Sequence, residues 1–185
     1  MTEATLPNMP EPEYSYIVKL DEIGPKTSAL SLSIGGKERR ALAKRFDLAS
    51  IEAVFADLSI TKNEGKIEAN GMLRAKLHQY CVISSEEVAA KVNEAIAIRF
   101  VRREEAPTSA EEEIELAEDD CDVQFYEGES IDVGEAISQS LILALDPFPR
   151  GPNADKVAEE MGLKGEQDVG PFSALKALKE QMEQK

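Results

Sequence analysis

Two residues with metal-binding or redox chemistry stand close together in this chain, His78 and Cys81. On a regular strand this spacing places the two side chains on opposite faces, where they share no metal ion; a turn here would remove the argument. The only other cysteine, Cys121, forms no CxxC spacing, so neither a disulfide framework nor a zinc site is supported. We interpret Cys81, together with Leu77, as a buried core residue, because free cysteines are among the most buried residues.

Groups that could do catalysis are scarce. His78 is the single histidine, and we find no carboxylate pair flanked like a metal site and no nucleophile beside a base. Residues 35–37, Gly-Gly-Lys, do not form a phosphate loop, because no glycine stands five residues before Gly36 and Glu38 occupies the place of the Ser or Thr. We therefore predict that the protein is not an enzyme and has no cofactor, no bound metal and no small-molecule substrate.

The most basic stretch, residues 36–48, is predicted to form a helix. Three apolar residues, Ala41, Leu42 and Phe46, share its inward side. The outward side carries five bases: Lys37, Arg39, Arg40, Lys44 and Arg45. A basic helix face is either solvated surface or a contact for RNA phosphates, so these five residues are the candidates for RNA contact.

One segment carries the whole net charge of −15. From Glu104 to Pro149 the chain has fifteen acidic residues and no lysine or arginine, while the remaining residues hold 21 acidic and 21 basic residues. Such a segment attracts basic partners and repels nucleic-acid phosphate, or it merely solvates a loop. Residues 104–120, with nine acidic residues, are predicted to form a long flexible loop. Its acidic run is a candidate partner contact: Glu111, Glu112 and Glu113.

Residues 128–150 contain the clearest element of the sequence, a helix near 132–145. Asp132 is predicted to cap it, with Glu135 three residues later completing a capping box. An apolar stripe at helical spacing predicts a buried face: Val133, Ile137, Leu141 and Leu145.

The exit of this helix is a second candidate partner contact. Pro147 and Pro149 end the helix and hold the residues around them extended. The segment is either a core helix with a hard stop or a docking site. In the second case three residues are the candidate contacts: Asp146, Phe148 and Arg150.

Apolar and polar residues alternate along several stretches, which predicts strands half buried in a sheet. These stretches are residues 14–20, 30–34, 54–60, 67–77 and 121–125. A turn at 62–65 joins residues 54–60 and 67–77 into a hairpin. Residues 84–93 fit a helix, because Ser84 and Glu87 match a capping box, or a strand, whereas 94–101 favour a strand.

These elements predict an α+β fold: a single domain with a mostly antiparallel β-sheet packed by a helix near 37–47 and a helix near 132–145, plus a C-terminal helical arm. The predicted boundaries are a disordered leader at 1–13, the α+β domain at 14–150 and an arm with short helices at 151–185. Because the sequence has no run of eighteen apolar residues and no charged-then-apolar leader, we expect a cytoplasmic protein without a membrane segment.

Four segments, in this order, resemble the YceD family of large ribosomal RNA subunit accumulation proteins. They are ERRALAKRFDLASIEAVFADLSI, GMLRAKLHQYCVIS, FYEGESIDVGEAISQSLILALDPFPR and PFSALKALK, and the resemblance covers about residues 14–180. Some relatives carry CxxC at the cysteine segment, whereas this chain has His78 in the first position, which removes support for a family metal or redox site. The resemblance implies a factor for large-subunit rRNA processing or accumulation without an assigned catalytic residue, and a strand at 86–101.

Three functions compete for such a factor. We favour a non-enzymatic ribosome-biogenesis factor for 23S rRNA that binds a basic ribosomal protein or rRNA-processing factor through its acidic region. The alternative is a protein that binds large-subunit rRNA directly through the basic face of residues 37–45. Further contacts in that case are Arg74, Arg99, Arg102 and Arg103. An enzyme such as a nuclease is the least supported function.

Overall fold

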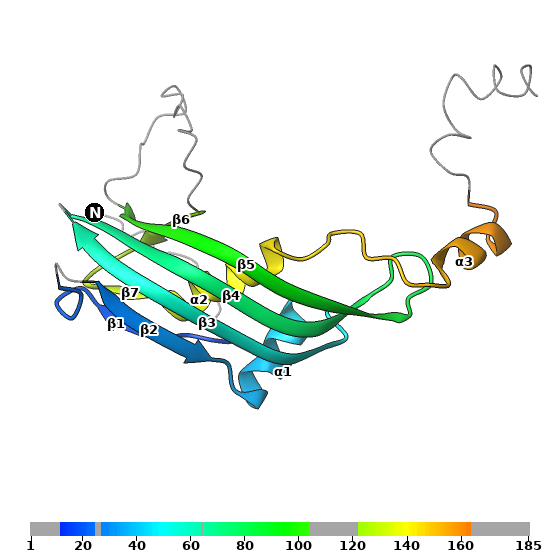
Figure 1. The fold of residues 1–185 in the computed structure, drawn as a ribbon, viewed down its shortest axis with the longest axis horizontal. Coiled ribbons are helices and arrows are strands. Elements are labelled where there is room, and N and C mark those ends of the chain that lie inside the picture. Colours follow the sequence, from blue (N-terminus) through cyan, green and yellow to red (C-terminus); the bar gives the residue numbers. More distant parts are fainter. Residues whose placement is uncertain (1–11, 25–26, 64, 104–121, 164–185) are drawn as a thin grey trace, which may run out of the picture. The chain divides into compact units, whose positions relative to one another are not determined.

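The computed structural model describes residues 12–24, 27–63, 65–103 and 122–163. Figure 1 shows its elements, which confirm the predicted α+β class. They are β1 (Ile17–Lys19), β2 (Ser28–Ser33), α1 (Gly36–Arg45), β3 (Ser50–Asn63), β4 (Lys66–Tyr80), β5 (Glu87–Arg102), β6 (Asp122–Tyr126), β7 (Ser130–Asp132), α2 (Val133–Leu143) and α3 (Ala154–Glu160).

The chain divides into two compact units, which are described separately. The first comprises residues 1–79 and 89–146, and the second comprises residues 80–88 and 147–185. The predicted boundaries at residues 13 and 150 stay predictions.

A five-stranded sheet forms the centre of the first unit, in the order β2-β3-β4-β5-β6. Strands β2, β3 and β4 pair antiparallel, and the edge strand β6 pairs with β5 in parallel. The predicted hairpin at 62–65 is present, since Asn63 pairs with Lys66 across the turn. Gly71 permits the close approach of β3 and β4, because a Cβ there would lie 2.0 Å from the Asp57 carbonyl oxygen.

The inner face of the sheet carries the core. Apolar residues alternate with polar ones along β3, β4 and β5, so one face of each strand is buried. Helices α1 and α2 cover this face, with Leu42 contributed by α1 and Ile137 and Leu141 by α2. The core residues of the three strands include Val54, Leu58, Ile60, Ile67, Leu73, Leu77, Val92, Ile98 and Phe100.

The start of α2 is fastened by its cap. The Asp132 carboxylate accepts the amide N–H of Glu135 at 3.1 Å, and also the Tyr16 N–H at 2.9 Å and the Ser15 hydroxyl at 2.7 Å. The predicted cap is therefore present, and it also holds the N-terminal segment. Gly134 is required here, because a Cβ would lie 2.4 Å from the Tyr16 nitrogen.

The Glu135 carboxylate has partners that the predicted capping box does not include. It accepts two hydrogen bonds from the Arg45 guanidinium, at 2.7 and 2.9 Å, and one from Gln139 at 2.9 Å. An acid in the first turn of α2 thus links this helix to the last residue of α1.

Other local predictions are refined by the structure. Of residues 14–20, only residues 17–19 form a strand, β1. It pairs antiparallel with β7, the strand directly before α2, in a separate two-stranded sheet. The ambiguous residues 84–93 resolve mainly into β5, which runs as one strand from residue 87 to 102. The acidic loop 104–120 and residues 164–185 of the predicted helical arm lie outside the described residues.

The second unit joins the turn after β4 to the segment that contains α3. The Val82 N–H donates to the Pro149 carbonyl at 3.0 Å. The Glu86 carboxylate accepts the Asn153 backbone N–H at 3.1 Å and its side-chain amide at 2.8 Å. The hydrogen bonds from the Asn153 side chain and backbone hold the pKa of Glu86 below its ordinary value.

Candidate functional site

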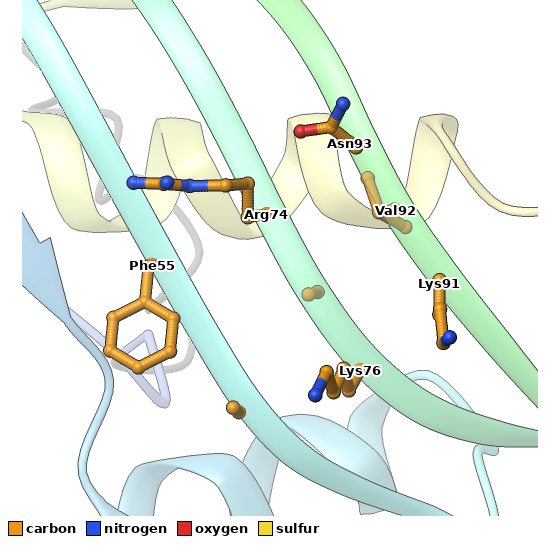
Figure 2. Close-up of a pocket in the computed structure, with 8 residues that line it drawn as sticks. Phe55, Arg74, Lys76, Lys91, Val92 and Asn93 are labelled. Carbon is orange, nitrogen blue, oxygen red and sulfur yellow. The ribbon is translucent and has the colours of Figure 1, made fainter.

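The outer face of the sheet, opposite α1 and α2, carries an exposed aromatic residue among cations. On β3, Phe55 lies directly opposite Arg74 of β4, and Ala53 lies opposite Lys76. Strand β5 contributes Lys91 (Figure 2). Because successive side chains of a strand alternate between faces, these residues are excluded from the core. We call Phe55, Arg74, Lys76, Lys91 and Asn93 the outer-face cluster.

The outer-face cluster surrounds an open hollow of about 550 Å³. The small side chain of Ala53 leaves space between Phe55 and Lys76. Figure 2 shows the Phe55 ring at β3, and Lys76 and Lys91 on the neighbouring strands. Among the described elements, both helices that pack against the sheet contribute to the core on the opposite side.

The charges of the outer-face cluster are only partly neutralised. Arg74 forms an ion pair with Asp57, which also accepts the Ser31 hydroxyl at 2.8 Å. Within the described ranges, Lys76 and Lys91 have no carboxylate within 4.0 Å. The cluster therefore presents an aromatic ring and two ammonium groups without an ion-pair partner among the described residues to the same hollow.

A second cationic surface lies on α1. Lys37, Arg40 and Lys44 are exposed, and their spacing of three and four residues places them along one side of the helix. We call these three residues the α1 stripe. Over the part of the chain that the structure describes, none of them has an ion-pair partner. Beside the stripe, α1 and the start of β3 enclose a hollow of about 310 Å³.

The other two predicted RNA-contact residues of α1 are engaged within the protein. Arg39 donates to the Ile34 carbonyl at 2.9 Å, and its Nε is buried without a hydrogen-bond partner in the described structure. Arg45 pairs with Glu135 at 2.7 Å and with Glu13 at 2.8 Å, and its side chain is 31% exposed. The hydrogen bond that Arg45 donates to Glu135 first, and the one that it donates to Glu13, raise the pKa of Arg45. Of the five bases predicted to face outward, three therefore remain available for RNA contact in the described structure.

A third hollow, of about 580 Å³, lies beside β1 and β7. Its wall mixes cations and anions: Lys19, Lys62, Arg102, Asp21 and Glu129. The Lys62 ammonium donates to the Leu20 carbonyl at 3.2 Å. Because opposite charges alternate around it, this hollow has no clear preference for a charged ligand.

The three predicted contacts at the α2 exit are divided between the two units. Asp146 belongs to the first, where its carbonyl accepts the Gln79 side-chain amide at 2.8 Å. Phe148 is exposed, and Arg150 forms an ion pair with Asp155 in the second unit. The acidic candidates Glu111, Glu112 and Glu113 lie outside the described residues.

Cys81 is buried, as expected, and lies in the second unit directly after β4, whereas Leu77 is buried in the core of the first unit. Its thiol is buried and accepts the Ser84 N–H at 3.3 Å. Hydrogen bonds from the Gly151 backbone first, and from the Ser84 side chain and backbone, lower the pKa of Cys81 to about 7. The burial of the thiol restricts access by reagents.

His78 has partners of its own in the first unit. Its Nδ1 lies 3.1 Å from the Ser50 hydroxyl and 3.5 Å from a Glu52 carboxylate oxygen. Within the described ranges, no three His, Cys, Asp or Glu side chains are grouped as a metal site. No helix in this part of the chain is long and apolar enough to cross a membrane.

The sequence reasoning missed most of the outer-face cluster. It named Arg74 as a further RNA contact but not Phe55, Lys76, Lys91 or Asn93. The available signal was Phe55 itself, an aromatic residue at a position of β3 where the alternation predicts a polar side chain. The contribution of β5 could not be predicted from the sequence. Residues 84–93 fit either a helix or a strand, so the face on which Lys91 and Asn93 lie was undetermined.

Comparison with known families gives one match. The model of the family described as Large ribosomal RNA subunit accumulation protein YceD matches residues 69–179, more than half of the chain. The predicted resemblance begins at about residue 14, whereas this match begins within β4 and leaves out α1 and β3. No curated protein and no solved structure matches the chain.

Proposed function

Because this chain belongs to the YceD family of large ribosomal RNA subunit accumulation proteins, we propose that it supports the accumulation of that RNA by binding it directly, without catalysis. Two properties of the first unit support this proposal: a cationic stripe, and an open sheet face with further cations that have no ion-pair partner among the described residues. Neither property requires a chemical step.

The α1 stripe is the observation that carries the proposal. Lys44 follows Lys37 by seven positions, which at a rise of 1.5 Å per residue is about 10 Å along the helix. Arg40 lies between them on the same side, so three cations follow one line on the surface. Cations in a row can contact successive phosphates of an RNA backbone, which fixes orientation without reading sequence. None of the three has a competing ion pair in the described structure.

The net charge of −15 does not oppose this proposal. The excess of acidic residues comes from the segment between Glu104 and Pro149, outside α1, β3, β4 and β5. Screening limits interactions between exposed charges to about 10 Å at 0.1 M salt. Within this segment, Glu135 lies beside α1, where it pairs with Arg45. Acidic residues that lie beyond the screening distance weaken RNA binding less than the same charges would within the α1 stripe.

The salt dependence of binding tests the proposal. Large-subunit rRNA transcribed in vitro is titrated with the full chain between 50 and 200 mM KCl, and log K is plotted against log salt. Each phosphate contact contributes about 0.7 to 0.9 to the slope, so replacing all three stripe residues by Gln should reduce the slope by about 2 to 3. Lys156→Gln, at an exposed position of α3, should leave the slope unchanged. No binding by the wild type, or an unchanged slope in the triple variant, would contradict the proposal.

A basic protein partner is a second candidate, and the edge of the sheet favours it. Strand β6 is an edge strand in the described structure, and its side chains Val123 and Phe125 are both exposed. From residue 122 to 149 the chain has no lysine or arginine. An edge strand flanked by acidic residues suits an added strand from a basic protein.

Purified basic proteins of the large subunit test this second candidate one at a time by calorimetric titration. Phe125→Asp should abolish binding of the partner, because a charge replaces an apolar contact, and deletion of residues 104–120 should weaken it. Phe55→Asp, an exposed aromatic position on another strand, is the matched control and should bind normally. Binding that survives both changes would remove the acidic region as the docking surface.

A further inference from the structure

We propose that the outer face of β3, β4 and β5 binds an unpaired stretch of RNA, with one base stacked on Phe55 and neighbouring phosphates held by Lys76 and Lys91. This inference rests on the proposed RNA-binding function and assigns it a second surface and a substrate class. It concerns the outer-face cluster alone, which shares no residue with the α1 stripe.

Phe55 supplies the stacking surface. It is 48% exposed although its neighbours along β3, Val54 and Ala56, are 1% exposed. The fold gains little from an aromatic ring at this position, since no described element covers it. A base stacked on such a ring gains favourable free energy whatever its identity, because every base has a π face.

The cations lie where the backbone of a stacked nucleotide would run. Lys76 follows Arg74 by two residues on β4, and Arg74 is the register partner of Phe55. Two residues of a strand span about 7 Å and neighbouring strands are about 4.8 Å apart, so Lys76 lies within reach of a phosphate next to a base on Phe55. Lys91 faces the same hollow from β5 (Figure 2). Asn93 adds an amide that can donate to or accept from a base edge.

The ligand chemistry follows from this combination. The two lysines, which have no ion-pair partner among the described residues, favour an anion, and the exposed ring beside them favours a flat apolar group. An RNA duplex offers phosphates but keeps its bases stacked inside, whereas a single strand offers both. The hollow of about 550 Å³ is open to one side, which suits a base laid down from solvent. An acidic peptide would satisfy the lysines and leave Phe55 unused.

The absence of tryptophan from the sequence provides a direct test. In the full chain with Phe55→Trp, the only tryptophan lies in the outer-face cluster, and stacking on a base should quench its fluorescence. The probes are a twelve-nucleotide uridine RNA, a twelve-nucleotide adenosine RNA, a twelve-base-pair RNA duplex and poly-glutamate. Both single strands should quench the tryptophan, and the duplex and poly-glutamate should not. Phe125→Trp is the matched control, because Phe125 is 50% exposed and lies on β6, and its fluorescence should not respond.

Affinity measurements complete the test. Phe55→Ala should weaken binding of the single strands about 5- to 140-fold, as expected for the loss of one stacked base, while Phe55→Tyr should restore it. Equal quenching by the duplex or by poly-glutamate, or an unchanged affinity in Phe55→Ala, would overturn the inference. If Phe55→Ala binds normally while the triple α1 variant loses binding, the inference fails and the proposed function stands. If the wild type binds no RNA, both fail.

Discussion

Helices α1 and α2 have nearly the same length and cover the same face of the sheet, but they are built differently. In α2, seven of eleven residues are buried, and the Asp132 side chain caps its first turn. In α1, two of ten residues are buried, and its N-cap residue is Gly35, which has no side chain that could cap the first turn. Five of the ten α1 residues are Lys or Arg, whereas α2 has none.

The difference separates stability from binding. The buried residues of α2 gain free energy from leaving water, so this helix contributes mainly to the core. Helix α1 leaves Lys37, Arg40 and Lys44 in solvent, where they add little to stability and remain available for phosphates. Arg45 joins the two helices through Glu135, and it is the α1 base whose charge is used for folding.

The largest expected effect lies in the buried side of α2. Leu141→Ala should lower the free energy of unfolding by about 2–5 kcal/mol, because Leu141 is 0% exposed and its loss leaves a cavity. Urea denaturation followed by circular dichroism measures this change. Leu143→Ala on the same helix is the control; its side chain is 72% exposed, and the change should stay within about 0.5 kcal/mol. Equal losses at the two positions would contradict the burial of α2.

The cap of α2 should have the next largest effect. Asp132→Ala should cost about 2 kcal/mol, at the upper end for N-caps, because the same carboxylate also holds Ser15 and Tyr16. Asp132→Asn keeps an oxygen for the Glu135 and Tyr16 amides and should retain most of the stability. Thermal or urea unfolding of both variants measures the difference. If alanine and asparagine were equally tolerated, the cap would not distinguish α2 from α1.

The link between the helices should have the smallest effect. A double-mutant cycle with Arg45→Gln and Glu135→Gln should give a coupling free energy of about 1 kcal/mol, because the pair is bidentate and partly buried. The coupling should decrease in 1 M NaCl. The exposed pair Lys156–Glu160 on α3 is the reference, and its coupling should not exceed about 0.5 kcal/mol. If the coupling free energy of Arg45 and Glu135 is no larger than that of the reference pair, Arg45 contributes no more to stability than the exposed cations of α1.

The two faces of the sheet show how far the sequence can be read. Alternation along β4 predicted which residues are buried, and its inner residues, among them Leu73 and Leu77, are in the core. The same alternation left the outer face described only as polar. Strand β5 was readable only in part, because Val88, Val92 and Ile96 also fit a helical period, and pairing within the sheet decides between the two.

The sequence by itself determined the local features of this protein. Asp132 with its apolar stripe specifies α2, and the alternation from Ile67 to Leu77 specifies β4, because capping and burial periods depend on neighbouring residues. Local patterns are complete within a few turns or strand residues, so no distant partner is needed to read them.

The tertiary structure decided what those elements do together. Arg45 meets Glu135 ninety residues away, which withdraws one predicted RNA contact from the surface. Phe55, Lys76 and Lys91 come from three strands and form one cluster only after the sheet is assembled. Such contacts depend on register and strand order, which are set by the burial of the whole inner face rather than by any single segment.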